Sequence, residues 1–471
     1  MPKNILIFSD GTGQAGGVRP DQRLSNVYKL YRATRSGPDS GIDPSRQVAF
    51  YDAGLGTDLD VGAMPFRIYS FLRKLIASIT GTGLTRNIIE CYENIVRVYE
   101  PGDRIYLFGF SRGAYTVRSV ANVLSLCGVP TTWRDGRPLR TFGRELRSVA
   151  AEAVKSVYEY GAGTPSGMDR AAQAELARRF RATYGSDANG KANVVPHFIG
   201  VFDTVAALGM PNTLRWIVFA GLSLFTLVVY WVIASVFEQK TLASLVVLTA
   251  FGAIGVAAIG YFIGRLRFAR DFPNLGDLRV RVASWRPGAY DLRLDPDVRY
   301  ARHALAIDER RKDFPRVGWG KRGDAPPRAR GDAEWFIQLW FPGCHSDIGG
   351  SYAETESRLS DLSLSWMLGE ATSVVDPLIY DESKLHLFPD AVGVQHCEIR
   401  KLKDLYPSWW PEFARFSWPA KDRTEALGSP MHESVAIRFE AAVVRDCGAA
   451  CSYRPATLRK DPRFRELYEK E

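Results

Sequence analysis

A serine flanked by glycines, lying between an apolar segment and an amphipathic one, places the strongest constraint on the fold. The segment Arg104–Phe108 has the composition of a buried strand, residues 109–113 (GFSRG) follow it, and residues 114–126 then carry apolar side chains at helical spacing. The two glycines remove side chains that would collide with backbone in a strained turn. The pattern predicts a strand, a sharp turn and a helix, with Ser111 presented at the turn as a nucleophile. A serine that only caps the helix is the alternative.

Other segments indicate the same fold class. Strands are predicted at residues 4–9, 47–51, 197–202, 278–283 and 335–341, and a helix at 85–100. Residues 301–311 (ARHALAIDERR) have a helical composition. This alternation predicts an α/β domain around a mostly parallel sheet. Residues 130–195 are polar and rich in arginine, and we expect a helical insertion or lid there.

Two uncharged apolar runs follow, Trp216–Phe237 and Thr241–Gly264. At about 1.5 Å per residue, each would cover a hydrocarbon core of about 30 Å as a helix. They predict a transmembrane helical hairpin at 214–266, inserted between two parts of the hydrolase core at 1–213 and 267–471; two buried core helices are the alternative. The arginines that flank the hairpin are Arg215, Arg265, Arg267 and Arg270. Their positions predict a multi-pass protein of the bacterial inner membrane with its catalytic domain in the cytoplasm.

Composition excludes several classes of protein. The chain has 471 residues, of which 46% are hydrophobic, so it has enough apolar material to fold and is not a disordered or collagen-like chain. Six cysteines make no dense disulfide framework. The net charge of +9 is modest and comes with no binding module, so no nucleic-acid partner is expected. Basic segments at 134–147 and 310–330 are either solvated or contact anionic lipid headgroups.

A serine nucleophile needs a histidine base that a carboxylate orients. In α/β hydrolases the three residues follow in the order serine, acid, histidine, each after a strand. Asp203 ends the strand predicted at 197–202 and is the candidate acid. Among six histidines, His345 lies in a glycine-rich loop after the strand at 335–341 and is the first choice of base, with His432 second. His303, in the helical-looking stretch, is better explained as a core residue.

The backbone around the serine predicts an oxyanion hole. The Arg112 N–H at the start of the helix would supply one donor, and the N–H of Gly11 or Thr12, after the first strand, would supply the other. Asp10, Asp52 and Asp347 are alternative metal ligands, but their spacing does not require a metal. We therefore expect neither a metal nor a cofactor.

Six ordered motifs resemble a known family. They are ILIFSDGT at residues 5–12 with its preceding Asn4, YDAGLGT at 51–57, LFGFSRGAYTVRSVA at 107–121, FIGVFDTVAALG at 198–209, ARHALAIDERR at 301–311 and WFPGCHSDIGG at 340–350. Together they resemble the α/β-hydrolase-domain family that includes the catalytic domains of type VI secretion phospholipase effectors. The resemblance implies an α/β-hydrolase fold and the hydrolysis of carboxylic esters, phospholipids among them. It also assigns Ser111, Asp203 and His345 to the triad. Two features depart from the family pattern. Ser351 stands where the last glycine of the histidine motif is expected, and a predicted transmembrane hairpin is not expected in a secreted toxin.

Together, these patterns predict a membrane-anchored serine hydrolase that cleaves phospholipids or other lipid acyl esters. The expected partners are the lipid substrate and the membrane, and the oligomeric state stays open. Two alternatives remain: an esterase or thioesterase with a soluble substrate, and a non-catalytic membrane scaffold that retains the hydrolase fold.

Overall fold

A computed structural model describes most of the chain. The described ranges are 2–11, 23–54, 82–163, 165–205, 262–283, 294–319, 331–404 and 417–469, with isolated positions between them.

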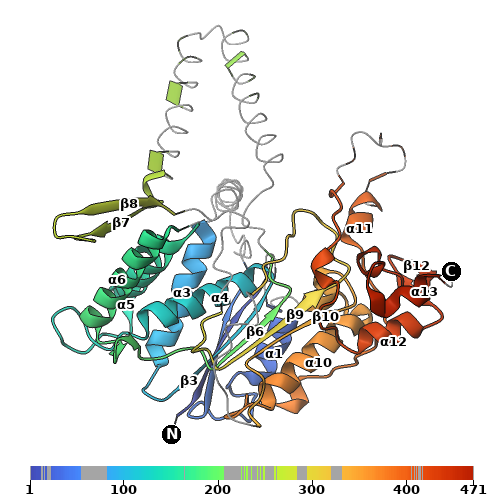
Figure 1. Cartoon of the computed structure of the whole chain (residues 1–471), viewed down its shortest axis with the longest axis horizontal. Coiled ribbons are helices and arrows are strands. Elements are labelled where there is room, and N and C mark those ends of the chain that lie inside the picture. Colours follow the sequence, from blue (N-terminus) through green and yellow to red (C-terminus); the bar gives the residue numbers. More distant parts are fainter. Residues whose placement is uncertain are drawn as a thin grey trace.

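Six parallel strands form the central sheet, in the order β10-β9-β6-β3-β1-β2. Their bounds are β1 Asn4–Ser9, β2 Gln47–Asp52, β3 Arg104–Phe110, β6 Phe198–Phe202, β9 Tyr300–Ala306 and β10 Phe336–Phe341. The first four come from the N-terminal half of the chain, and the last two follow the apolar runs. Because all six run in the same direction, their carboxyl ends meet at one edge, and this edge lies opposite the N-terminus (Figure 1).

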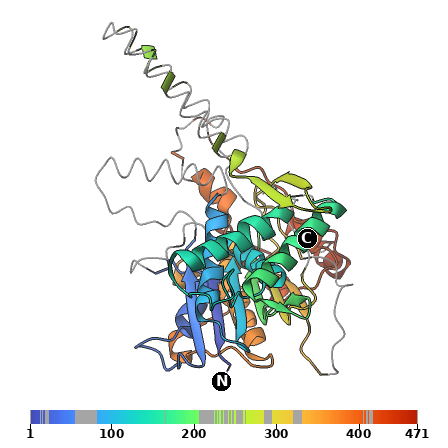
Figure 2. The same ribbon diagram turned by 90° about the vertical axis from the view of Figure 1, so that its left-hand side faces the viewer.

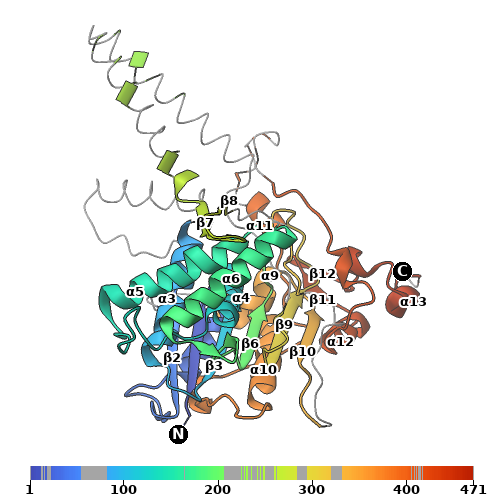
Figure 3. The same ribbon diagram turned by 60° about the vertical axis from the view of Figure 1, so that its left-hand side comes forward.

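Helices cover both faces of the sheet. On one face, alternate strand residues such as Ile5 and Leu107 pack against α3 (Thr82–Val98), α4 (Arg112–Cys127), α5 (Gly143–Ala151), the π-helix η1 (Glu152–Tyr158) and α6 (Gly167–Tyr184). On the other face, the intervening residues, such as Leu6 and Phe108, pack against α1 (Asn26–Thr34) and α10 (Arg358–Thr372). Figure 3 shows α5 and α6 in front of the sheet. The period of two along each strand therefore builds a three-layer α/β/α core.

The C-terminal region packs against the edge of the sheet formed by β9 and β10. Its helices are α9 (His345–Gly349), α11 (Glu398–Asp404), α12 (Ser434–Glu440) and α13 (Arg465–Glu469). A separate apolar cluster joins Leu305 and Trp340 of the sheet to Val435, Tyr453 and Phe464. Small two-stranded sheets pair β4 (Asp187–Ala188) with β5 (Lys191–Ala192), β7 (Leu266–Arg270) with β8 (Leu278–Val282), and β11 (Val444–Asp446) with β12 (Ala449–Cys451).

The prediction of an α/β fold with a mostly parallel sheet is confirmed. One element is wrong: residues 301–311 begin with strand β9 rather than a helix. All seven residues of β9 are buried between β6 and β10, and tertiary packing there outweighs the helical propensity of its alanines. The strand predicted at 278–283 forms, as β8, but in a hairpin outside the central sheet.

The predicted transmembrane hairpin lies mostly outside the described residues. Isolated described positions there, such as Leu224, Trp231 and Leu248, are helical and exposed. Within the part of the chain that the structure describes, no helix has the length and apolar character needed to cross a membrane. The inserted transmembrane hairpin is therefore unsupported.

The arginines of the two basic segments lie mainly against acids of the protein itself. Arg134 pairs with Glu152, Arg137 with Glu145 at 2.7 Å, and Arg147 with Glu93 at 2.6 Å. In the second segment, Arg311 pairs with Glu309 at 2.7 Å and is largely buried, whereas residues 320–330 are outside the described ranges. These pairs neutralise part of the charge of each segment, whereas Arg140 and Arg144 are exposed.

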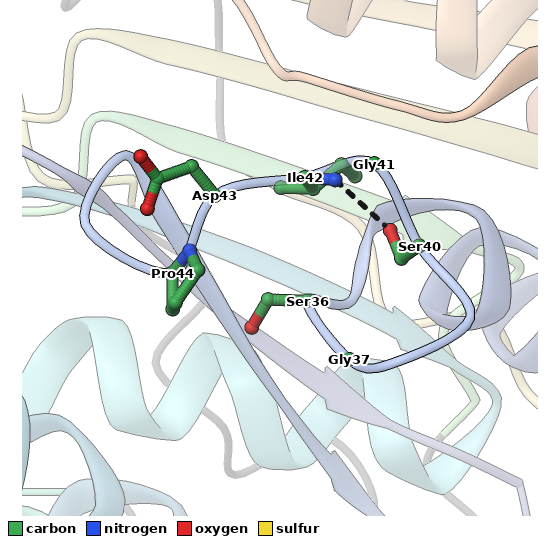
Figure 4. Close-up of a pocket in the computed structure, with 7 residues that line it drawn as sticks. All are labelled: Ser36, Gly37, Ser40, Gly41, Ile42, Asp43 and Pro44. Carbon is green, nitrogen blue, oxygen red and sulfur yellow. Dashed lines mark hydrogen bonds between the residues drawn. The ribbon is translucent and has the colours of Figure 1, made fainter.

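A surface hollow lies far from the carboxyl edge of the sheet. It is lined by residues 36, 37 and 40–44, which connect the end of α1 to the start of β2 (Figure 4). This connection lies at the amino ends of the strands, so the hollow is separate from the residues that the sequence singled out.

Candidate active site

Ser111 lies on a strained turn at the carboxyl end of β3. Its φ of 58° is in the left-handed region, and α4 begins at the next residue. A Cβ on Gly109 would lie 2.6 Å from the backbone of Ala114, and one on Gly113 would lie 2.0 Å from the Ser9 carbonyl oxygen. Both glycines are therefore sterically required, as the sequence predicted, and the turn has the geometry of a nucleophile elbow.

Asp203 and His345 lie together beside this turn. The backbone N–H of Ser111 donates to the carbonyl of Phe202 at 3.1 Å, which sets the end of β6 next to the elbow. Asp203 follows β6 with a φ of 36° and is fully buried. The Nδ1 atom of His345, the first residue of α9, lies 2.6 Å from Asp203 Oδ2. An Nδ1–H that donates to this carboxylate leaves Nε2 as the basic nitrogen.

Aromatic rings hold the imidazole of His345 in place. The ring centroid of Phe110 lies 4.7 Å away, and that of Phe314 lies 5.5 Å away at a steep angle. Phe110 directly precedes Ser111, so the same side chain contacts both the elbow and the imidazole. The His345 backbone N–H also donates to Glu309 Oε2 at 3.3 Å. The imidazole is buried and has little freedom to rotate.

Arg423 is a fourth member of this group, and no sequence pattern pointed to it. Its Nη1 donates to Asp203 Oδ1 at 2.6 Å and its Nη2 to Asp203 Oδ2 at 3.1 Å. Burial alone would raise the pKa of Asp203, but the charge of Arg423 and the hydrogen bond from His345 outweigh it and hold that pKa below its ordinary value. Asp203 is therefore a carboxylate held between a guanidinium and an imidazole.

Of the residues predicted for the oxyanion hole, the structure describes Arg112 and Gly11, and both adjoin Ser111. Arg112 is the first residue of α4, where backbone N–H groups have no acceptor within the helix. A Cβ on Gly11 would lie 3.4 Å from the Cβ of Ser111, so this loop adjoins the elbow. The Gly11 N–H, however, donates to the Asp10 carboxylate at 2.7 Å. Thr12 lies outside the described residues.

The two other histidines considered, His432 and His303, contact residues other than Asp203 as hydrogen-bond partners. His432 stacks on Phe341 at 4.5 Å between ring centroids, and its Nδ1 contacts the Ser434 hydroxyl at 2.9 Å. His303 is buried within β9, where Thr204 N–H donates to its Nε2 at 3.3 Å, and burial holds its pKa well below the ordinary value. His345 is the histidine that these contacts bring to Asp203.

The three aspartates considered as metal ligands have protein partners. Asp10 accepts hydrogen bonds from Tyr51 at 2.7 Å and from Ser25, and burial raises its pKa to about 6. Asp52 accepts from Ser9 at 2.8 Å, and burial raises its pKa to about 7. Asp347 binds the ring of His396 at 2.8 Å. Within the described ranges, no cluster of three or more histidine, cysteine or acidic side chains is placed to hold a metal ion.

The fold is therefore an α/β architecture with a strained serine turn and a buried aspartate–histidine pair at the carboxyl edge of its parallel sheet. Residues 3–370 match the family model described as the type VI secretion system phospholipase effector Tle1-like catalytic domain. The chain belongs to this family, as its motifs indicated.

Individual relatives are more distant. The uncharacterized protein YEL023C of Saccharomyces cerevisiae is 26% identical over 418 residues, which cover 78% of this chain and 57% of the yeast protein. A crystal structure of an uncharacterized protein from Pseudomonas aeruginosa is 18% identical, with a TM-score of 0.34, and the match covers 82% of this chain and 47% of that one. The Tle1 effector bound to the VgrG spike is 17% identical, with a TM-score of 0.30, over 76% and 53% of the two chains. This chain thus spans little more than half of the yeast relative.

The predicted localisation, a multi-pass protein of the bacterial inner membrane, is wrong. The family is described as effectors of a secretion system, which conflicts with a protein resident in that membrane. Among the described residues, moreover, there is no helix capable of spanning a bilayer.

Proposed function

We propose that this protein is a serine hydrolase that cleaves the carboxylic esters of lipids, with phospholipids as the substrate class. The contact of 2.6 Å between His345 and Asp203, at the sheet edge where Ser111 lies on its strained turn, is the observation that carries this proposal. Membership of the phospholipase effector family supports the choice of substrate.

In the proposed mechanism, Ser111 Oγ attacks the carbonyl carbon of the ester while His345 Nε2 takes the hydroxyl proton. The proton passes to the leaving alcohol, and the acyl group stays on Ser111. Water then attacks the acyl-enzyme, with His345 again as the base, and the fatty acid is released. Asp203 fixes the tautomer of His345 and stabilises the imidazolium that forms in each step.

Backbone N–H groups at the start of α4 would stabilise the oxyanion, with that of Arg112 foremost. The Gly11 loop lies beside Ser111 and is the proposed second source. Its N–H would have to exchange its hydrogen bond with Asp10 for one with the substrate oxygen. A protonated Asp10, whose raised pKa favours the neutral form, would release that N–H more readily.

Labelling with a fluorophosphonate probe tests the nucleophile. We expect the intact protein to react and Ser111→Ala to remain unlabelled, while Ser119→Ala, a buried serine of the same helix, keeps its reactivity. Labelling that persists in Ser111→Ala would disprove the mechanism, and an unreactive intact protein would favour a non-catalytic scaffold.

Comparison of substrates tests the lipid assignment. Phospholipid vesicles and short-chain nitrophenyl esters would be offered to the same preparation, with fatty acid and nitrophenol release measured. We expect fatty acid release from vesicles. Turnover of the short esters alone would instead assign the protein to esterases of soluble substrates.

A further inference from the structure

The hairpin β7–β8 turns its polar face toward the protein and its apolar face outward. Its strands are antiparallel, with Phe268 opposite Val280 and Arg267 opposite Arg281. Because side chains alternate along a strand, the two pairs lie on opposite faces. A two-stranded sheet on a protein surface normally packs its apolar side inward and exposes its polar side. This hairpin has the reverse arrangement.

The inward face is held by arginines. Arg267 pairs with the buried carboxylate of Glu159, and Arg281 donates to the carbonyl of Tyr160 at 2.8 Å. Arg279 lies 3.5 Å from Asp169 at the start of α6. Between them, Ala269 is buried against Tyr160 and Ala172. These contacts fix which face of the hairpin points to the protein.

The outward face is correspondingly apolar. Phe268 is 47% exposed, Leu278 58% and Val280 50%. Leu275, in the turn between the strands, is 92% exposed, so the apolar surface extends to the tip of the hairpin. A contiguous exposed apolar surface of this kind marks an interaction site for another protein or for a membrane.

Three features indicate which kind of partner this apolar face binds. Exposed apolar side chains continue onto the segment that leads into β7, at Ile259, Phe262 and Ile263, so the surface is not limited to one small patch. Arg270 is exposed beside Leu278 on the same face and would complement an anionic surface. The hairpin also lies on the side of the molecule to which the carboxyl ends of the sheet point, where Ser111 and Asp203 are (Figures 1 and 2).

We propose that the outward face of β7–β8 docks on the surface of a lipid bilayer and so brings the carboxyl edge of the sheet toward its substrate. The hairpin enters the headgroup region without spanning the bilayer, with Leu275 at its tip and Phe268, Leu278 and Val280 on the apolar side. The choice of a bilayer rests on the proposed lipid substrate.

Two valines make a matched pair for the test. Val280 on the hairpin and Val375 are 50% and 51% exposed, and Val375 lies at the amino edge of the sheet, where its carbonyl contacts His197. Binding would be measured by co-sedimentation of the full chain with vesicles of equimolar phosphatidylcholine and phosphatidylglycerol. The Ser111→Ala background keeps the lipid intact. We expect Val280→Asp to lower partitioning by about tenfold, through lost apolar burial and repulsion by anionic lipid, and Val375→Asp to leave it unchanged.

Amide hydrogen exchange of the full chain supplies an independent readout. We expect vesicles to slow exchange in residues 271–277, at the tip, by about tenfold, with no change around Val375. Unchanged exchange at the tip, or equal loss of binding in both aspartate variants, would overturn the proposal. Protection that appears without lipid and grows with protein concentration would instead assign the face to a second copy of the chain.

The outcome is separable from that of the proposed function. With Ser111 intact, Val280→Asp should hydrolyse short-chain esters as fast as the unmodified protein, because Val280 belongs to neither the proposed triad nor the proposed oxyanion hole. Vesicle binding without any ester hydrolysis would refute the hydrolase and leave the docking face standing. Hydrolysis of vesicle lipid that is indifferent to Val280→Asp would refute the docking face alone.

Discussion

Replacement of Arg423 by glutamine tests whether a second cation is needed at the proposed triad. The guanidinium contacts both oxygens of Asp203, and both side chains are buried. Two unit charges about 4 Å apart interact by about 4 kcal/mol at an effective dielectric constant of 20. An interaction of this size is large enough to hold the pKa of Asp203 below its ordinary value against the effect of burial.

Without the arginine, only His345 opposes the effect of burial, so we expect the pKa of Asp203 to rise. The depressed pKa of the intact protein keeps Asp203 ionised well into the acid range. In Arg423→Gln the carboxylate takes up a proton as the pH falls through the raised pKa, and His345 then loses its anionic partner. We therefore expect activity on the acid side to be lost at a higher pH than in the unmodified protein.

Stability should change in the same direction. An acid whose folded-state pKa is depressed contributes stability above its unfolded pKa, and this contribution is lost as the pH falls through the folded value. Arg423→Gln abolishes that contribution and leaves a buried carboxylate without its cation, which costs about 3 to 5 kcal/mol near neutral pH. Urea unfolding at several pH values would measure the loss.

The decisive assay is kcat/KM for a short-chain ester as a function of pH. We expect Arg423→Gln to move the acid limb upward by at least about one pH unit. Arg423→Lys keeps the positive charge but loses the bidentate hydrogen bonds to Asp203. The acid limb of its pH profile should therefore stay near that of the unmodified protein. An unchanged limb in a folded Arg423→Gln protein, as judged by circular dichroism, would refute the electrostatic role and leave Arg423 a structural residue.

Three further substitutions have defined outcomes. Gly113→Ala should cost about 3 kcal/mol in urea unfolding, because its Cβ would lie 2.0 Å from the Ser9 carbonyl oxygen, whereas Gly41→Ala, in open space, should cost nothing; equal effects would contradict the steric argument. His396→Gln should cost about 1 kcal/mol at low pH and less as the pH rises. Burial opposes the charge of His396, but Asp347 and Glu356 outweigh it and raise its pKa, so the stabilisation is complete below the ordinary value of 6.5 and is lost through the raised one; a pH-independent cost would contradict this. Arg112→Gln should raise KM for phospholipids by about tenfold and affect neutral esters less, because burial beside Ser111 lowers the pKa of this guanidinium to about 10 and a charged group so placed binds phosphate strongly; equal changes for both substrates would exclude such binding.

The sequence predicted the parts of the site that depend on local patterns. The apolar strand before residues 109–113 and the helical stripe after them predicted the elbow at Ser111. The close approach of backbone to Gly109 and Gly113 explains why both positions are glycine. Asp203 and His345 were found because each follows a buried strand of a parallel sheet, whose carboxyl ends meet at one edge. Their roles in catalysis remain predictions.

Contacts between distant parts of the chain were beyond prediction. Arg423 lies in an irregular segment 220 residues after Asp203, and no periodicity connects them. Strand β9 was mistaken for a helix because alanine and arginine favour helices, while the burial that decides its conformation comes from β6 and β10 on either side. The hydrogen bond from Gly11 to Asp10 depends on the conformation of one loop, which composition does not determine.

The order of strands in the sheet has a consequence for how this fold can vary. β6 and β9 are hydrogen-bonded neighbours, yet the chain leaves the carboxyl end of β6 at Asp203 and returns to the amino end of β9 near Val298. Everything between, including the β7–β8 hairpin, is a crossover, and each doubling of such a connection adds only about 0.6 kcal/mol of closure entropy. Ser111 and Asp203 precede this crossover in the chain and His345 follows it, each after a strand of the central sheet. The crossover can therefore lengthen at little entropic cost while the paired strands β6 and β9 keep their positions.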